Sequence, residues 1–471
     1  VERSSPFTLI MLKKVSSWIP WKYLVRHIAR RQGFLDPFEL TARMRQFAQP
    51  SEVQEPVELL RAGAVFHARG LVNTKVIQSN MDWVWPYWVQ RQFSPYDVSF
   101  VPRAFSFSHI NLTHRTWTGI GLPGMDTYPI VDPRGLVTPH TDGYSIDHWL
   151  ILPDGRMLFP SKAEHSKQRW IGDSAIGFGL ETEIYDGEEP LAIVRYNVRP
   201  SGEYAELVVH FELCDASPSG EGKSPQLVVA ARPFNPEGVQ FIDDLKYDKD
   251  SWSVQVEGER DIIFDRPANS AHFGNFHNGD VIRRITHGVD EIETECEAGL
   301  ATGAFVFDTA DGQNSLEYVV PLDSAPRGLF SRPKRGSERS VKRRKKEGAK
   351  NESQATTKAR QPMVGTWEAS WRDVARLQVP NQRFNEIFDT SLRTLILLSP
   401  RSCYPGPYTY RRFWFRDTCL IGASLLYANL SERLPPVFEE FFQRQRSDGY
   451  FHSQEGEWDA NGQVLWLWNL Y

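Results

Sequence analysis

The chain has few cysteines and no long hydrophobic run. Its 471 residues include 4 cysteines, without a CxxC pair or the spacing of metal ligands: Cys214, Cys296, Cys403 and Cys419. Reduced thiols are therefore expected, rather than a disulfide framework or a cysteine metal site. The apolar run FTLIML, residues 7–12, is too short to span a membrane, and no signal-peptide cleavage site follows it. These features predict a cytoplasmic protein without a membrane span.

The sequence also lacks a strong net charge and the motifs of nucleotide and serine-hydrolase chemistry. A net charge of −5 gives no general attraction to nucleic acid or acidic membranes. There is no P-loop, no G-x-G-x-x-G after a strand and no G-x-S-x-G turn. Residues 332–360 are the exception, since 12 Lys/Arg against 3 Glu give +9 and leave −14 for the rest. This run is expected to be a solvated linker, and RNA binding is the alternative it leaves open.

Aromatic residues are abundant. They make up 13% of the chain, with 15 Trp and 16 Tyr, although the mean hydropathy is only −0.44. A hydrophobic content of 41% over this length is enough for two or three domain cores. Aromatic rings usually pack in such cores, and they also stack on the flat apolar faces of sugars.

The hydrophobic period changes along the chain. Residues 1–64 form a helical and extended segment, in which WKYLVRHIARRQGF predicts a basic surface helix; an interfacial membrane helix is the alternative. Residues 65–330 follow a two-residue period in short β-branched and aromatic runs such as AELVVHFELCD and PQLVVAARPF. Many such runs between Gly, Pro, Asp and Asn predict an antiparallel β-sandwich domain. The basic linker is assigned to residues 331–362.

The helical period returns in residues 363–471. Four helices are predicted, at residues 381–399, 417–429, 435–445 and 459–471. The first carries an apolar stripe of Phe384, Ile387, Phe388, Leu392, Leu395 and Ile396. Asp417 and Asp459 are expected to open the second and fourth helices, and a proline the third. Short connections predict antiparallel neighbours, so the second and fourth helices should begin at the same end.

Each of these two helices follows a polar and aromatic segment, RRFWFRD and FHSQEGEWD. An Asp at such a position is usually only a helix cap. Trp414, Arg416 and Trp458 stand beside the two aspartates, however, and capping does not account for them. A sugar offers an apolar ring face for stacking and hydroxyl groups for charge-assisted hydrogen bonds, so this composition predicts a saccharide site.

The sequence YRRFWFRDTCLIGASLL, followed about 40 residues later by EWDANGQVLWL, resembles the opening of an (α/α)6 toroid of the six-hairpin glycosidases. It is most similar to glucoamylases and related bacterial α-glucosidases of glycoside hydrolase family 15, and to bacterial amylo-α-1,6-glucosidase-like debranching proteins. The resemblance implies an N-terminal β-supersandwich followed by the beginning of the toroid. It implies that Arg416 and Asp417 bind the nonreducing-end glucosyl unit, that Trp414 lines the same subsite, and that Asp459 lies at the pocket floor.

The resemblance implies hydrolysis of α-glucosides with inversion, without a cofactor or a metal. Inversion needs an acid and a base roughly 6.5–9.5 Å apart. The family places both later in the toroid, so they are expected beyond Tyr471, and this fragment is expected to be inactive. Glu457 is a weak catalytic candidate, because repulsion among Glu455, Glu457 and Asp459 could keep one carboxyl protonated; a solvated turn is the ordinary interpretation.

Several alternatives stay open. The protein could be a non-catalytic carbohydrate-binding or scaffold protein, and the expected partner in either case is an α-glucan or oligosaccharide. The sequence does not decide between α-1,4, α-1,6 and trehalose-type linkages, and it does not fix the oligomeric state. Two histidine-containing segments, PHTDGYSIDH and HFGNFHNGD, suggest metal sites, but nothing indicates that their side chains converge, and no metal is predicted.

Overall fold

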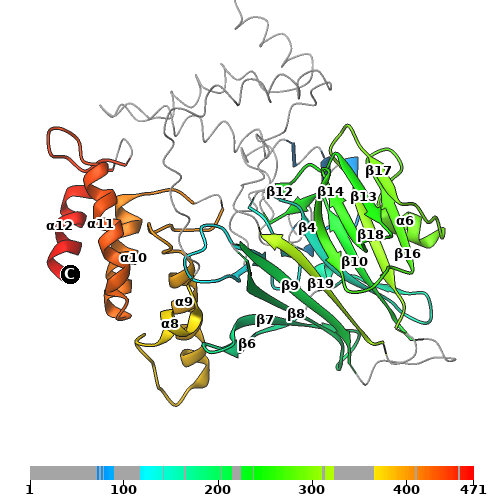
Figure 1. Cartoon of the computed structure of the whole chain (residues 1–471), viewed down its shortest axis with the longest axis horizontal. Coiled ribbons are helices and arrows are strands. Elements are labelled where there is room, and N and C mark those ends of the chain that lie inside the picture. The colour runs from blue at the N-terminus through cyan, green and yellow to red at the C-terminus, as the bar shows by residue number, and fades with distance from the viewer. Residues whose placement is uncertain are drawn as a thin grey trace, which may run out of the picture. The chain divides into compact units, whose positions relative to one another are not determined.

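The computed structural model describes residues 72–89 in part, most of residues 117–322 and most of residues 365–471 (Figure 1). The predictions for residues 1–64 and for the basic linker at 331–362 lie outside the described residues. In the part of the chain that is described, no helix is long and apolar enough to cross a membrane.

Two antiparallel sheets make up most of residues 118–322. The first has eight strands: β1 (Thr118–Gly119), β2 (Ile130–Val131), β3 (Val137–Thr138), β4 (Ser145–Ile151), β10 (Gln226–Arg232), β18 (Thr302–Phe307) and β16 (Ser270–Gly274) in spatial order, with β5 (Met157–Leu158) paired to β4. The second has nine, again in spatial order: β17 (Glu293–Glu295), β13 (Asp244–Asp248), β14 (Ser253–Val256), β15 (Glu259–Phe264), β19 (Ser315–Leu322), β9 (Tyr204–Leu213), β8 (Pro190–Ser201), β7 (Gly177–Tyr185) and β6 (Lys167–Asp173). A separate short hairpin joins β11 (Phe234–Asn235) and β12 (Gly238–Val239).

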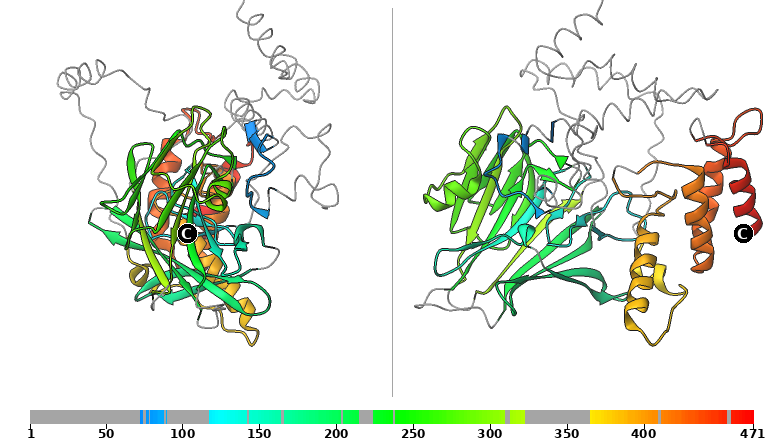
Figure 2. Two further views of the ribbon diagram at one scale, coloured as in Figure 1. Left: turned by 90° about the vertical axis from the view of Figure 1, so that its right-hand side faces the viewer. Right: turned by 180° about the vertical axis from the view of Figure 1, so that it is seen from behind.

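The two sheets pack face to face (Figures 1 and 2). Phe305 of β18 contacts Tyr247 of β13 and Phe264 of β15, with ring centroids 5.4 Å apart in both pairs. His148 of β4 reaches across in the same way, and its Nε2 lies 2.8 Å from the hydroxyl of Tyr318 on β19. All these side chains are buried. The antiparallel, sheet-rich character that the two-residue period predicts is therefore confirmed.

A short helix covers the outer face of the eight-stranded sheet. This helix, α6 (Val281–Thr286), packs apolar side chains against that face, where Trp149 of β4 is fully buried. Directly before α6, Asp280 forms an ion pair with Arg232 of β10, with Oδ1 2.6 Å from Nη1. The two charged residues are 1% and 0% exposed, so each depends on the other to compensate its charge.

The C-terminal part is helical. Its elements are α8 (Trp367–Trp371), α9 (Gln382–Leu397), α10 (Phe415–Tyr427), the 3-10 turn η4 (Ser431–Arg433), α11 (Leu434–Gln443) and α12 (Ala460–Leu470). The four predicted helices correspond to α9, α10, α11 and α12, while the five-residue α8 was not predicted. The predicted stripe of α9 is only partly buried: Leu392 and Ile396 are inside, whereas Phe384 and Ile387 are 59% and 52% exposed.

Two predicted helix starts are wrong. Helix α10 begins at Phe415 with Trp414 at its N-cap, so Asp417 stands in the first turn and is not the cap. Helix α11 begins at Leu434, one residue before its two prolines, because η4 leads directly into it. Asp459 does stand at the N-cap of α12, although its carboxylate caps no backbone N–H there.

An aromatic seam joins the first helices to the nine-stranded sheet. Phe178 of β7 contacts Trp367 and Trp371 of α8, with both centroid distances 5.1 Å. The guanidinium of Arg393 on α9 lies 4.3 Å from the centre of the Phe178 ring. Trp367 also donates its indole N–H to the carbonyl of Gly121, at 2.8 Å. Buried rings and a stacked cation therefore stabilise this contact.

Candidate functional site

Helices α10 and α12 run parallel and begin side by side. Near their starts, Arg416 Nε lies 3.2 Å from Asp459 Oδ2, and Arg416 Nη2 lies 3.3 Å from Asp459 Oδ1. Further along both helices, Gly422 approaches Leu467 so closely that a Cβ on the glycine would be 2.8 Å from Leu467 Cδ2. Because the two contacts occur in the same order along both helices, the prediction that these helices start at the same end is confirmed.

The first turn of α10 is capped by a carboxylate from another part of the chain. Glu457 Oε1 accepts the backbone N–H of Arg416 at 3.0 Å, and its Oε2 accepts the hydroxyl of Ser453. First-turn N–H groups have no partner within their own helix, so Glu457 supplies one. Glu457 is only 3% exposed. The interpretation of this residue as part of a solvated turn is therefore wrong.

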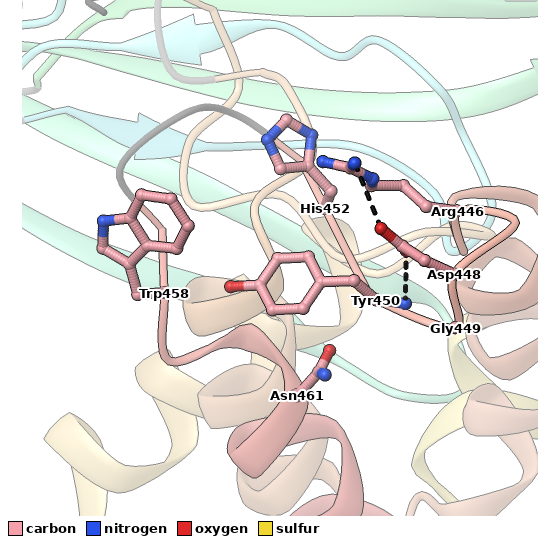
Figure 3. Close-up of a pocket in the computed structure, with 7 residues that line it drawn as sticks. All are labelled: Arg446, Asp448, Gly449, Tyr450, His452, Trp458 and Asn461. Atoms are coloured by element: carbon pink, nitrogen blue, oxygen red, sulfur yellow. Dashed lines mark hydrogen bonds and ion pairs between the residues drawn. The ribbon is translucent and has the colours of Figure 1, made fainter. Parts of the chain in front are cut away.

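An open pocket of about 460 Å³ lies beside this junction (Figure 3). Its walls come from the turn after α11 and from the start of α12: Arg446, Asp448, Gly449, Tyr450, His452, Trp458 and Asn461. The rings of Tyr450 and Trp458 are neighbours, with centroids 6.5 Å apart. Tyr450 also donates its hydroxyl to the carbonyl of Glu457 at 3.1 Å, which ties the pocket wall to the capping residue.

Local hydrogen bonds fix the turn that forms one side of the pocket. Arg446 and Asp448 form an ion pair at 3.1 Å, and Asp448 Oδ1 accepts the backbone N–H of Tyr450 at 3.1 Å. Between them Gly449 has φ +86°, a left-handed conformation that glycine adopts without steric cost. Asn461 of α12 then accepts the N–H of Phe451 at 2.7 Å. The turn is thereby attached to the first turn of α12.

The five residues predicted to bind substrate lie around the starts of α10 and α12. Trp458 lines the pocket and is 65% exposed. Arg416 and Asp459 pair with each other, and about half of each side chain is exposed. Trp414 lies under the guanidinium of Arg412, 4.6 Å from the ring centre, and Asp417 is half-buried. Only Trp458 among the five is a wall residue of this pocket.

Sequence reasoning missed the other polar and aromatic walls. Arg446, Asp448, Tyr450, His452 and Asn461 were not proposed as site residues. A usable signal was present, because SDG is a turn sequence and aromatic residues follow it directly. What the signal lacks is any indication that this turn folds back onto α12.

The ionisable groups at the junction influence one another. Burial raises the pKa of the Glu457 carboxyl above its usual range, although the N–H and the charge of Arg416 partly oppose this effect. The hydrogen bond from Arg416 lowers the pKa of Asp459, and the same bond raises the pKa of Arg416. The junction therefore presents an ionised Arg–Asp pair to solvent next to a carboxyl group that is hard to ionise.

His148 and His272, from the two histidine-containing segments, each hydrogen-bond within the protein. His148 uses both ring nitrogens inside the sandwich, with Nδ1 3.2 Å from the Gly135 carbonyl, and burial lowers its pKa to about 3. His272 lies 2.7 Å from the Val289 carbonyl through its Nδ1. Across the residues that the structure describes, which exclude Asp142, no three His, Cys, Asp or Glu side chains are grouped to hold an ion.

Comparisons with known proteins show similarity only at the level of solved structures, and that similarity is distant. The sequence matches no family model and no curated protein. Among solved structures it matches a bacterial glucoamylase complexed with acarbose, with a TM-score of 0.46 and 10% identity, over 72% of this chain and 52% of that one. The chain thus spans about half the length of that enzyme. The similarity is too remote to assign a site or an activity.

Proposed function

We propose that this chain is part of a carbohydrate-active protein of the glucoamylase or debranching type, and that the pocket beside α10 and α12 binds a glucosyl unit of an α-glucan or oligosaccharide. The observation that carries this proposal is the combination of two neighbouring rings, Tyr450 and Trp458, with the Arg446–Asp448 ion pair around one open pocket. Asp459 follows Trp458 in the sequence and forms an ion pair with Arg416 at the start of α10.

This combination suits a neutral sugar. The ring faces can stack on the apolar face of a pyranose, and the charged side chains can hydrogen-bond to its hydroxyl groups. A pocket of about 460 Å³ is within the usual size of a small-ligand site. Trp458 is well suited to stacking because it is 65% exposed and therefore accessible.

The reaction is proposed from the sequence resemblance. We propose that the full-length protein hydrolyses α-glucosides with inversion, through a general acid and a general base. Neither role is assigned to Glu457, because both of its carboxylate oxygens are bonded within the protein. Cytoplasmic localisation belongs to the same proposal, and it is supported by the cysteines, which are all described and form no disulfide.

Isothermal titration calorimetry with maltotriose tests the binding proposal. Trp458→Ala and Tyr450→Ala should each weaken binding roughly tenfold, because a stacked ring contributes about 1.5 kcal/mol. Trp466→Ala is the matched control, since Trp466 is 41% exposed on α12 and is not a wall residue. If both pocket variants bind as the wild type does, the site is wrongly placed.

Product analysis separates the enzyme from the non-catalytic binding protein. The full-length gene product is incubated with maltose, panose, glycogen and trehalose, and the anomeric form of released glucose is measured. Release of the inverted anomer supports the proposed reaction. Binding of maltotriose without hydrolysis of any of these substrates would favour a carbohydrate-binding or scaffold protein.

A further inference from the structure

Glu457 contacts every element that meets at the junction. Its side chain accepts the N–H of Arg416 at the start of α10 and the hydroxyl of Ser453 beyond the pocket turn. Its carbonyl accepts the hydroxyl of Tyr450. The next two residues are Trp458, which lines the pocket, and Asp459, which pairs with Arg416.

We propose that Glu457 is a positioning residue for the glucosyl site, through which the start of α10 fixes the pocket wall that Tyr450 and Trp458 form. This inference rests on the proposed function and extends it, because it states what holds the aromatic wall in place. The Glu457 backbone anchors the Tyr450 hydroxyl, and its side chain anchors that backbone to α10. Without the bond to Arg416, the turn that carries Trp458 would have one contact fewer with the rest of the site.

Global stability does not explain why a carboxylate occupies this position. Burial raises the pKa of Glu457 more than its hydrogen bonds lower it. A carboxyl whose pKa is raised on folding contributes stability below its unfolded pKa of 4.5, and that contribution is lost as the pH rises through the folded pKa. Ionisation of Glu457 in the folded protein therefore costs stability, while the geometry that its hydrogen bonds impose remains.

The charged surroundings of Glu457 are few. From α10 it is faced by Arg416 and by the thiol of Cys419, whose pKa burial raises to about 12 with a smaller contribution from Glu457. From the start of α12 it is faced by Asp459, and from the pocket turn by the hydroxyls of Tyr450 and Ser453. Among the described residues, Arg416 is the cation that most lowers the pKa of Glu457.

Two variants and a control test the positioning role. Glu457→Ala should weaken maltotriose binding at pH 7 at least tenfold. Glu457→Gln keeps an acceptor oxygen for the Arg416 N–H, so it should bind within about threefold of the wild type and be no less stable to urea. Glu439→Ala, at an exposed glutamate of α11, should change nothing.

The pH profile of binding shows whether the charge of Glu457 matters for the affinity. A protonated Glu457 keeps an acceptor oxygen for the Arg416 N–H, as the amide of Glu457→Gln does, so the affinity should depend on pH in the same way in the wild type and in Glu457→Gln. The proposal is overturned if Glu457→Ala binds like the wild type, or if Glu457→Gln binds as weakly as Glu457→Ala.

Amide hydrogen exchange tests the positioning without any sugar. Glu457→Ala should accelerate exchange in a peptide that covers residues 414–420, because the Arg416 N–H loses its acceptor. If the wild type binds no maltotriose but exchange is faster in Glu457→Ala, the proposed function is wrong and the positioning role of Glu457 stands. Unchanged exchange would remove the positioning role whatever the sugar result.

Discussion

Replacement of Arg232 should cause the largest loss of stability that we predict. Arg232 Nη1 and Nη2 lie 2.6 and 2.9 Å from the two oxygens of Asp280, and both residues are almost completely buried. Asp280 also accepts the backbone N–H of Val84 at 2.7 Å, and Arg232 donates to the carbonyl of Val84 at 3.1 Å. Arg232→Met therefore leaves a carboxylate in the interior without its cation.

The expected magnitude follows from burial. Removal of one partner from a buried ion pair costs about 3–5 kcal/mol, because the remaining charge is uncompensated. Arg156 provides the matched control, since it also pairs with two carboxylates but its side chain is 58% exposed. Arg156→Met should hardly change the stability, because solvent screens its exposed ion pairs. Adding Asp280→Asn to Arg232→Met should recover about 2 kcal/mol, because the amide is neutral and still accepts the Val84 N–H.

Urea unfolding at pH 7 measures the stability of four proteins: the wild type, Arg232→Met, Arg232→Met with Asp280→Asn, and Arg156→Met. The midpoint should fall strongly for Arg232→Met, partly recover in the double variant and hardly change for Arg156→Met. The reasoning is refuted if Arg232→Met and Arg156→Met are equally stable, or if the double variant is no more stable than Arg232→Met alone. In either case the buried charge is not what determines the loss.

Three further predictions concern the site, the seam and acid stability. Asp459→Asn should change the free energy of unfolding by less than about 1 kcal/mol, since its ion pair is exposed, yet weaken maltotriose binding in calorimetry. Arg393→Ala should cost about 2 kcal/mol in urea unfolding through the lost contact with Phe178; a change below about 0.5 kcal/mol would contradict this. The pKa of His148 is about 3 in the folded protein and 6.5 in the unfolded chain, so as the pH falls the unfolded chain takes up the proton before the folded protein does. Stability should fall by about 1.4 kcal/mol per pH unit from pH 6.5 downwards, and His148→Gln should reduce this slope in urea titrations at pH 7, 5 and 4.

Local patterns predicted the elements better than their ends. Strand β9 alternates exposed or half-buried with buried residues along its whole length, as its sequence suggests. Helix α8 was missed because five residues are too short for a helical period. The start of α10 was misplaced because Asp is a favoured N-cap, whereas the actual acceptor, Glu457, lies 41 residues further along the chain. A cap from that distance is not visible in a local pattern.

The arrangement of residues at the junction of α10 and α12 was predicted only in part. The sequence places Trp458 and Asp459 next to each other, and parallel helices bring Arg416 to them. Whether a turn such as residues 446–450 joins this group depends on long-range bonds, for example the one between Asn461 and Phe451. Such bonds follow from the packed structure and have no periodic signature in the sequence.

The acidic composition of the junction follows from the parallel orientation of α10 and α12. Two helix N-termini at one place bring two partial positive charges together, which is unfavourable. Asp417 and Asp459 offset this, at about 0.3–1 kcal/mol for each favourably placed carboxylate. The guanidinium of Arg416 pairs with Asp459, and in the pocket wall that of Arg446 pairs with Asp448, so each of these cations already has a carboxylate partner when a ligand approaches. On the proposed function, a neutral glucoside therefore suits this site better than a phosphorylated sugar, in agreement with ring stacking as the proposed attraction in the adjacent pocket.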